Sequence, residues 1–407
     1  MHGRPGGTRR RRLSGMTITV LRADRLFDGT GAPPVDNPTV VIDGRRIVSV
    51  NAADVPAGAT VVHLPGATLL PGLVDTHVHL AFDASPDPVA ALAGRDAAET
   101  FAVMCTAARR AARAGVTTVR DLGDVDHLAL GVRAAARTDP TLPEILAAGV
   151  PITTPGGHCH FLGGAASGVE GVRAAVRDRH ERGVDVIKVM VSGGNMTPGS
   201  RPETVQFTDD ELRALVGEAH TLGLQVAAHA HGAAAIVAAV AAGVDSLEHA
   251  SFMTADSVED IPDGLLDEIN RRGVALSLTL GLRVDEGSTL PPAMAARLPK
   301  LTANAAAMCA SGARVVVGTD AGIGPVKPHD VLPTALVQLI RIGMTPAAAL
   351  HAMTGRAAEV VGLGDRKGKV VAGYDADLLA VDGDPLADPS ALHRIRAVYV
   401  RGAALTR

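Results

Sequence analysis

The stretch from residue 225 to residue 249, QVAAHAHGAAAIVAAVAAGVDSLEH, carries the pattern that decides the fold. A short apolar run ends in histidines, an alanine-rich helical segment follows, and after Gly243 a second short run ends in another histidine. An apolar run, a helix and a second apolar run form a βαβ unit, whose two strands lie parallel. The stretch therefore predicts a parallel sheet with histidines at the ends of its strands.

The same alternation repeats between residues 68 and 365. Helical segments separate eight short apolar runs, and one of these segments opens with Thr208 and Glu211 at the spacing of a capping box. The runs cover residues 69–78, 116–122, 145–149, 186–191, 225–229, 246–249, 274–279 and 315–320. Eight βα units in about 290 residues predict a (β/α)8 TIM barrel. A doubly wound sheet would also need a glycine-rich phosphate-binding turn after its first strand, and the sequence has none there.

Both ends of the chain have a different pattern from the barrel region. Residues 16–67 contain short strand-like segments separated by Gly, Pro and Asp-Gly turns, and residues 366–407 return to β character. We therefore expect a small β-sandwich domain built from 16–67 and 366–407, with a barrel of residues 68–365 between its two parts. Residues 1–15 are arginine-rich without apolar periodicity, and we expect a disordered leader there.

The composition excludes several classes of protein. With 47% hydrophobic residues and a net charge of −4, the chain can bury a large core and has no general basic field for nucleic acid. No apolar run reaches the ~18 residues of a membrane span. The three cysteines form no CxxC motif, which favours a reducing, cytoplasmic compartment. We expect a small-molecule substrate and neither a nucleic-acid nor a membrane partner. The sequence is compatible with a homo-oligomer.

Polar side chains fall at the ends of the predicted barrel strands, where enzymes of this fold carry their active sites. They are His77, His79, Lys188, His229, His249 and Asp320. His77 and His79 lie two residues apart on a strand, so their imidazoles point to the same side. A single histidine at a strand end is usually structural. Six such residues at one end of one barrel instead predict a metal site of the imidazole and carboxylate type that zinc prefers, with iron or manganese as alternatives.

The motifs that carry these residues resemble those of the amidohydrolase superfamily. The similar segments are PGLVDTHVH, GVTTVRDLG, DVIKVMVSGG, AHAHG, GVDSLEHA, GTDAG and the C-terminal GKVVAGYDADLLAVDGDP. A lysine in the fourth strand together with AHAHG is most similar to the imidazolonepropionase-like and Xaa-Pro dipeptidase-like branch. The resemblance extends over about residues 16–407 and implies a metal-dependent hydrolase.

The resemblance implies a ligand role for each residue of the set. His77 and His79 would bind the more buried ion, and His229 and His249 would bind a second one. Lys188 would bridge the two ions as an N-carboxylated side chain, because a plain ammonium group repels a cation. If Lys188 is unmodified, the alternative is a single ion bound by His77, His79, His229 and Asp320.

The resemblance also implies catalytic and substrate-binding roles. Asp320 would ligate the first ion and shuttle a proton. For His158 the resemblance implies contact with the substrate, with a structural role in its loop as the alternative. The position of His231, two residues beyond His229 on the same face, independently favours contact with the substrate or stabilisation of an oxyanion, with an orienting role as the alternative. Lys327, together with His329 and Asp330, is a candidate for the mouth of the site.

These observations predict a metal-dependent hydrolase that cleaves an amide-type C–N bond with a metal-activated water molecule. A peptide-like compound, an N-acyl amino acid or a cyclic amide would be its substrate. A deaminase, a cyclic-imide hydrolase or a lactonase would use the same water, so the ligand set does not separate them. A non-catalytic scaffold relative is a more distant alternative, because such proteins typically lose metal ligands.

Overall fold

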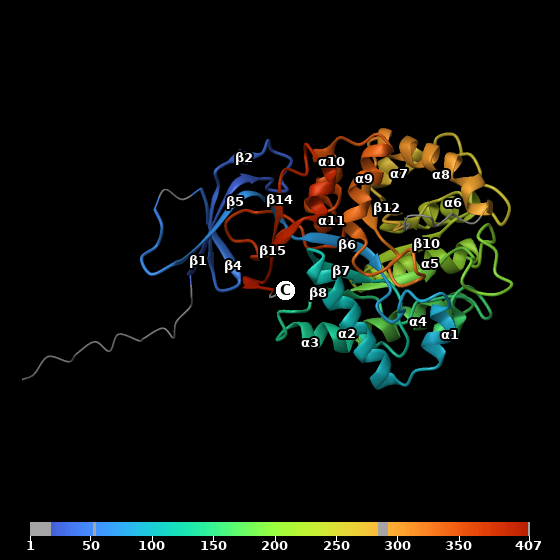
Figure 1. Ribbon diagram of the computed structural model, residues 1–407. Helices are drawn as coiled ribbons and strands as arrows, with labels where there is room; N and C mark the ends of the chain where they lie inside the picture. Colours follow the sequence, from blue (N-terminus) through green and yellow to red (C-terminus); the bar gives the residue numbers. More distant parts are fainter. Residues whose placement is uncertain (1–17, 52–53, 284–291, 406–407) are drawn as a thin grey trace, which may run out of the picture.

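A computed structural model describes residues 18–51, 54–283 and 292–405 of the chain. The predicted leader, residues 1–15, lies outside the described residues. Figure 1 shows a small sheet beside a larger body in which helices surround a set of strands.

The larger body contains eight strands at the predicted places, all parallel to their neighbours. They are β6 (Leu73–Val78), β7 (Val116–Asp121), β8 (Glu144–Ala147), β9 (Val186–Met190), β10 (Gln225–Ala230), β11 (Ser246–His249), β12 (Ala275–Thr279) and β13 (Arg314–Gly318). Residues 69–71 of the first predicted run, 69–78, belong to the small sheet instead. β6, β7 and β8 form one sheet, and β9 to β13 form a second. Single β-bridges join the two sheets at both seams, between Val78 and Ala321 and between Ile152 and Val189. The strand order is of the TIM-barrel type, but the hydrogen-bonded ladder is divided into two sheets.

Helices follow the strands and cover their outer side (Figure 1). Their bounds are α1 (Pro88–Ala93), α2 (Ala97–Arg113), α3 (Leu128–Ala136), α4 (Val169–Glu181), α5 (Asp209–Thr221), α6 (Ala233–Ala242), α7 (Leu265–Arg272), α8 (Pro292–Ala310), α9 (Ala335–Arg341), α10 (Pro346–Ala352) and α11 (Gly355–Val360), with short 3-10 turns at His160–Leu162, Leu332–Thr334 and Pro389–His393. The predicted capping box of Thr208 and Glu211 opens α5, and Gly243 ends α6 in the left-handed conformation.

The small sheet contains strands from both ends of the chain. It consists of β1 (Ile18–Leu26), β2 (Val35–Asp36), β3 (Thr39–Asp43), β4 (Arg46–Val50), β5 (Thr60–Pro71), β14 (Leu378–Asp382), β15 (Ile395–Val400) and β16 (Ala403–Ala404). The order is β16-β15-β14-β5-β1-β3-β4, with β2 paired to β1. The hydrogen bonds define one eight-stranded sheet, so the predicted sandwich of two sheets is not confirmed.

A buried charge cluster connects the small sheet to the barrel. The Lys367 side chain is 1% exposed; its Nζ atom lies 3.1 Å from Glu144 of β8 and 3.3 Å from Asp375, and it also pairs with Asp377. Arg366 pairs with Glu144 and lies 2.7 Å from Asp375. The cluster therefore ties β8 to the segment that leads into β14.

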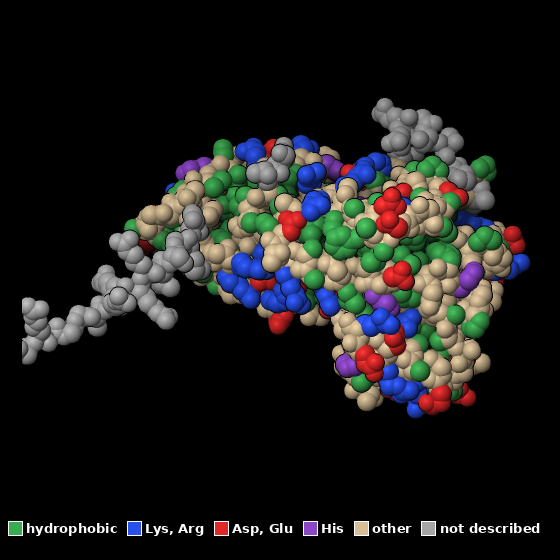
Figure 2. Space-filling model, turned by 90° about the horizontal axis from the view of Figure 1, so that it is seen from below, with side chains coloured by type: hydrophobic (Ala, Val, Ile, Leu, Met, Phe, Trp, Pro, Cys, Tyr) green, Lys and Arg blue, Asp and Glu red, His purple; other side chains and the backbone are tan. Residues whose placement is uncertain are grey.

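Charged side chains of both signs share the face of the molecule that Figure 2 shows. On the face shown in Figure 2, groups of Lys and Arg are mixed with acidic side chains, so this face carries no broad field of one sign. Within the described ranges, no helix has both the length and the apolar character needed to cross a membrane. Cys105, Cys159 and Cys309 are free thiols.

Candidate metal centre

Two groups of buried donor atoms lie at the carboxyl ends of the barrel strands. In each group, the possible ligand atoms lie within 4.8 Å of one another. One group consists of His77, His79 and Asp320, and the other of His229, His231 and His249.

The first group forms where β6 meets β13. The Nε2 atoms of His77 and His79 lie 3.2 Å apart, so the two side chains point to the same side, as their spacing predicts. The Oδ1 atom of Asp320 lies 3.5 Å from Nε2 of His77 and 3.3 Å from Nε2 of His79. The backbone N–H of Asp320 donates to the carbonyl oxygen of His77 at 2.7 Å, which fixes the distance between the two strand ends.

Polar partners on the far side of both rings orient them. Nδ1 of His79 lies 3.0 Å from the carbonyl oxygen of Gly123, an acceptor, so Nδ1 donates and the neutral ring has its lone pair on Nε2. Nδ1 of His77 lies 3.1 Å from Oε2 of Glu248, and both side chains are fully buried. Glu248 in turn accepts a 2.8 Å hydrogen bond from Arg120. Carbonyl and carboxylate partners of this kind hold metal-ligating histidines in position.

Lys188 of β9 completes this end of the site. Its Nζ atom lies 3.5 Å from Nε2 of His77, and the residue is 2% exposed. Burial lowers the pKa of Lys188 to about 8, although Glu248 and Asp320 act in the opposite direction. The lowered pKa increases the fraction of uncharged amine, which is the form that can react with carbon dioxide.

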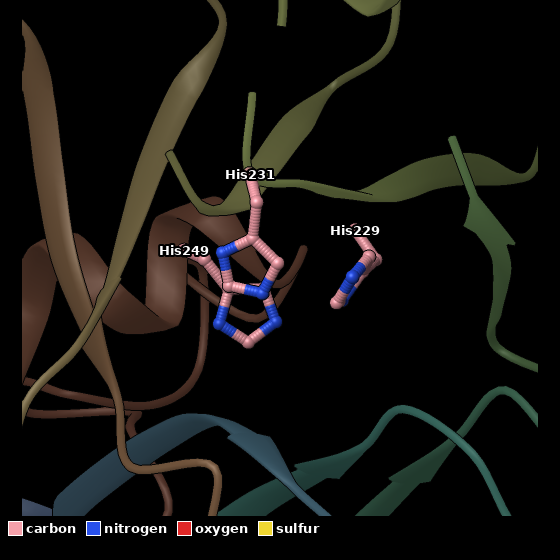
Figure 3. Close-up of side chains that lie close together, drawn as sticks. All are labelled: His229, His231 and His249. Atoms are coloured by element: carbon pink, nitrogen blue, oxygen red, sulfur yellow. The ribbon is translucent and has the colours of Figure 1, made fainter. Parts of the chain in front are cut away.

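The second group comes from β10 and β11. Figure 3 shows the rings of His231 and His249 stacked, with His229 to one side; the stacked ring centroids lie 4.4 Å apart. Nε2 of His229 lies 3.0 Å from the carbonyl oxygen of Gly193, which leaves Nδ1 as the free nitrogen in this geometry. The sequence pattern predicts that His231 contacts the substrate. In the structure it lies as close to His229 and His249 as a third metal ligand would lie.

Burial keeps most of these imidazoles uncharged. It lowers the pKa of His77 and of His231 to about 4, and it lowers the pKa values of His229 and His249 well below the ordinary value. His79 differs, because Asp320 outweighs burial and raises its pKa. Neutral imidazole is the form that binds metal ions.

The carboxylate of Asp320 is held in its charged form. Burial raises the pKa of Asp320, but His77, His79 and Lys327 outweigh burial and keep it below its ordinary value. The residue also has a left-handed backbone with a φ of 59°, and His249 has a φ of 70°. Such conformations are costly for non-glycine residues and concentrate at functional sites.

A cavity of about 790 Å³ opens from both donor groups. His158, predicted as a substrate contact, lines it and lies with its ring centroid 4.8 Å from that of His229. Methionine and leucine side chains make up much of the remaining lining, including Met196, Met253, Met308, Leu278, Leu301 and Leu298. The cavity therefore joins a polar floor to apolar walls.

The three residues predicted to line the mouth of the site, Lys327, His329 and Asp330, lie in different surroundings. Lys327 is buried and lines the cavity. His329 is also buried, but its Nε2 donates to the carbonyl oxygen of Phe82. Asp330 faces outward and pairs with Arg110 at 3.0 Å and with Arg283 at 3.1 Å.

Sequence analysis missed three charged residues that support the ligands. Arg120 and Glu248 form a buried ion pair behind His77. Asp75 accepts hydrogen bonds from the backbone and hydroxyl of Thr319 at 2.9 and 2.6 Å, which clamps β6 to β13. The available signal was a charged residue inside an apolar strand, the same signal that identified Lys188.

The donor set fits a divalent metal ion. Six buried nitrogen and oxygen donors converge in two groups, and partners on the outer side of the rings leave ring nitrogens free to bind. Imidazole with carboxylate is the ligand chemistry of zinc and related ions.

Comparisons with known proteins identify a family and several similar chains. The amidohydrolase family matches residues 68–405. The chain is 31% identical to an ochratoxinase of Aspergillus niger over 427 residues, which cover 94% of this chain and 84% of the relative. It is 25% identical to an imidazolonepropionase of Streptomyces griseus subsp. griseus, with 90% of each chain covered. The solved structure of a Xaa-Pro dipeptidase with methionine in its active site is similar with a TM-score of 0.83 and 27% identity, and covers 96% of this chain and 100% of that one.

Taken with the fold and the donor set, these comparisons indicate a hydrolase that acts on carbon–nitrogen bonds. The chain belongs to the amidohydrolase family.

Proposed function

We propose that the protein is a metal-dependent hydrolase of amide bonds in small, largely apolar substrates, such as N-acyl amino acids or peptide-like compounds. The observation that carries the proposal is the convergence of two buried groups, His77–His79–Asp320 and His229–His231–His249, on an apolar cavity. The Nζ atom of Lys188 lies 3.5 Å from the first group, at Nε2 of His77. The proposed ligands are His77, His79, Lys188, His229, His249 and Asp320, with Lys188 N-carboxylated.

The metal and the chain supply different parts of the chemistry. Divalent ions, when bound, lower the pKa of a coordinated water molecule from ~15.7 towards ~7 and polarise the carbonyl group. Asp320 accepts the proton of the attacking water, because its carboxylate stays charged at neutral pH. It then returns this proton to the leaving nitrogen. His158 and His231 line the cavity and orient the scissile carbonyl group.

Replacing Asp320 by asparagine tests the proposal. We expect Asp320→Asn to lower kcat by ~10²–10⁴-fold, the usual contribution of a positioned acid–base group. The assay uses zinc-loaded protein with N-acyl amino acids, dipeptides, cyclic imides and lactones, and product analysis separates amine, ammonia and ring-opened acid. Asp330→Asn is the matched control, because this carboxylate lies on the same loop but pairs with arginines outside the site.

Two outcomes would contradict the proposal. An unchanged kcat in Asp320→Asn, with its metal content retained, would remove the proton-shuttle role. Failure of the metal-loaded wild-type protein to cleave any amide in the panel would reject amide hydrolysis.

A further inference from the structure

Lys327 is a buried cation in the cavity to which the proposed reaction assigns no role. The residue is 7% exposed. Its Nζ atom donates to the carbonyl oxygens of Thr319 at 2.7 Å and of Thr279 at 3.0 Å, at the ends of the neighbouring strands β13 and β12. An ammonium group has three N–H donors. Two are therefore used by the backbone, and a third is available to a molecule in the cavity.

Among the residues that the structure describes, no carboxylate oxygen lies within 4.0 Å of the Lys327 ammonium group. Asp320 and Asp75 influence this charge without forming an ion pair with it. A buried ammonium group is stable when a negative partner is close. The position of Lys327 thus favours an anion that arrives with the ligand.

The charged residues that line the cavity also favour an anionic ligand. Apart from the proposed metal ligands Lys188 and Asp320, the described lining residues include two basic side chains, Lys327 and Arg341, and no acidic one. Divalent ions in the two donor groups would add further positive charge. The remaining wall is mostly apolar, so the cavity offers one place for an anionic group and a large space for an uncharged one.

We propose that Lys327 binds a carboxylate of the substrate, so that the site selects amides which combine an apolar group with a carboxylate. This inference rests on the proposed function and deepens it. The ammonium group would fix the substrate beside Asp320, with the apolar group against the methionine and leucine wall.

Binding of two ligands without an amide bond tests this assignment. Hydrocinnamate carries a phenyl group and a carboxylate, and benzylacetone is the uncharged methyl ketone of the same length. Calorimetry with zinc-loaded protein is expected to show that Lys327→Gln weakens hydrocinnamate binding by about 10-fold or more, because a charge-assisted hydrogen bond is lost. Benzylacetone carries no charge and loses no charge-assisted hydrogen bond in this variant, so its binding should change less than about 2-fold.

Two controls locate the anion. Lys327→Arg keeps the charge and is expected to keep the preference for the carboxylate. Arg341→Met removes a cation from the same cavity, and a loss of hydrocinnamate binding in this variant instead of Lys327→Gln would overturn the assignment. Unchanged hydrocinnamate binding in Lys327→Gln would also overturn it.

A crystal structure of the zinc-loaded wild-type protein with hydrocinnamate needs no variant. The carboxylate is expected within hydrogen-bond distance of Nζ of Lys327, and a carboxylate on the zinc ions or on Arg341 would overturn the inference. Because neither ligand can be hydrolysed, these results are independent of amide cleavage, so failure of the inference and failure of the proposed function are distinguishable.

Discussion

Glu248 is fully buried, and each of its two carboxylate oxygens faces different partners. Arg120 and the hydroxyl of Ser246 donate to Oε1 at 2.8 and 2.7 Å, and Nδ1 of His77 lies 3.1 Å from Oε2. Burial raises the pKa of Glu248, but Arg120 and His77 outweigh it and lower the pKa below its ordinary range. The charged carboxylate therefore orients His77 for a ligand on its other nitrogen.

Replacing this carboxylate by an amide of the same shape should weaken metal binding. We expect Glu248→Gln to lower zinc affinity by ~10–100-fold, the usual effect of removing the partner of a metal-ligating histidine. Competition with a chelator measures this affinity directly. Glu218→Gln is the control, because Glu218 pairs with Arg177 on the outer surface. Equal zinc affinities of the two variants would contradict the orienting role.

At the scale of elements, the close contact of β13 with β6 depends on Gly318. A Cβ atom at this position would lie 2.2 Å from Cβ of His77 and 2.9 Å from the hydroxyl oxygen of Ser277. Both neighbours belong to strands and have little room to move. The last residue of β13 must therefore be glycine for Asp320 to approach the two histidines.

A methyl group at this contact should disturb both the fold and the metal site. Gly318→Ala is expected to lower the free energy of unfolding by about 1–3 kcal/mol, the usual cost of overpacking a core. It should also reduce the zinc content. Urea unfolding and elemental analysis measure the two effects. Gly324→Ala is the control, because a Cβ atom there meets nothing within 4 Å, and equal stabilities would refute the steric argument.

The positions of the strands could be predicted from the sequence, because apolar runs and glycine-ended helices repeat along the chain. The residues at the strand ends could be predicted for the same reason, and His77 and His79 meet as their spacing requires. The division into two sheets could not be predicted, because it depends on hydrogen bonding between strands. The place of His231 beside His249 depends on side-chain torsion angles, which a sequence pattern does not contain.

At the scale of the whole molecule, the buried charge cluster should make stability depend on pH. Burial raises the pKa of Glu144, but Arg366 and Lys367 outweigh burial and lower it to about 2, from an ordinary value of 4.5. The unfolded chain therefore binds a proton at a higher pH than the folded protein does. The contribution of Glu144 is present above about pH 4.5 and is lost as the pH falls towards about 2.

Comparison with Glu144→Gln isolates this contribution. The variant is expected to be less stable than the wild-type protein at pH 7, and its urea midpoint should change less between pH 5 and pH 3. Parallel pH profiles of the two proteins would show that Glu144 does not couple the barrel to the small sheet.

The sheet that unites both ends of the chain also imposes an order on biosynthesis. β5 pairs with β14 through residues 67–71, and these partners are separated by roughly 300 residues, which at ~5–20 residues per second take about 15–60 seconds to translate. During this interval the apolar edge of β5 emerges from the ribosome without its neighbour. We expect a nascent chain stalled before residue 378 to bind chaperones through this edge, and to be released when β14 is synthesised.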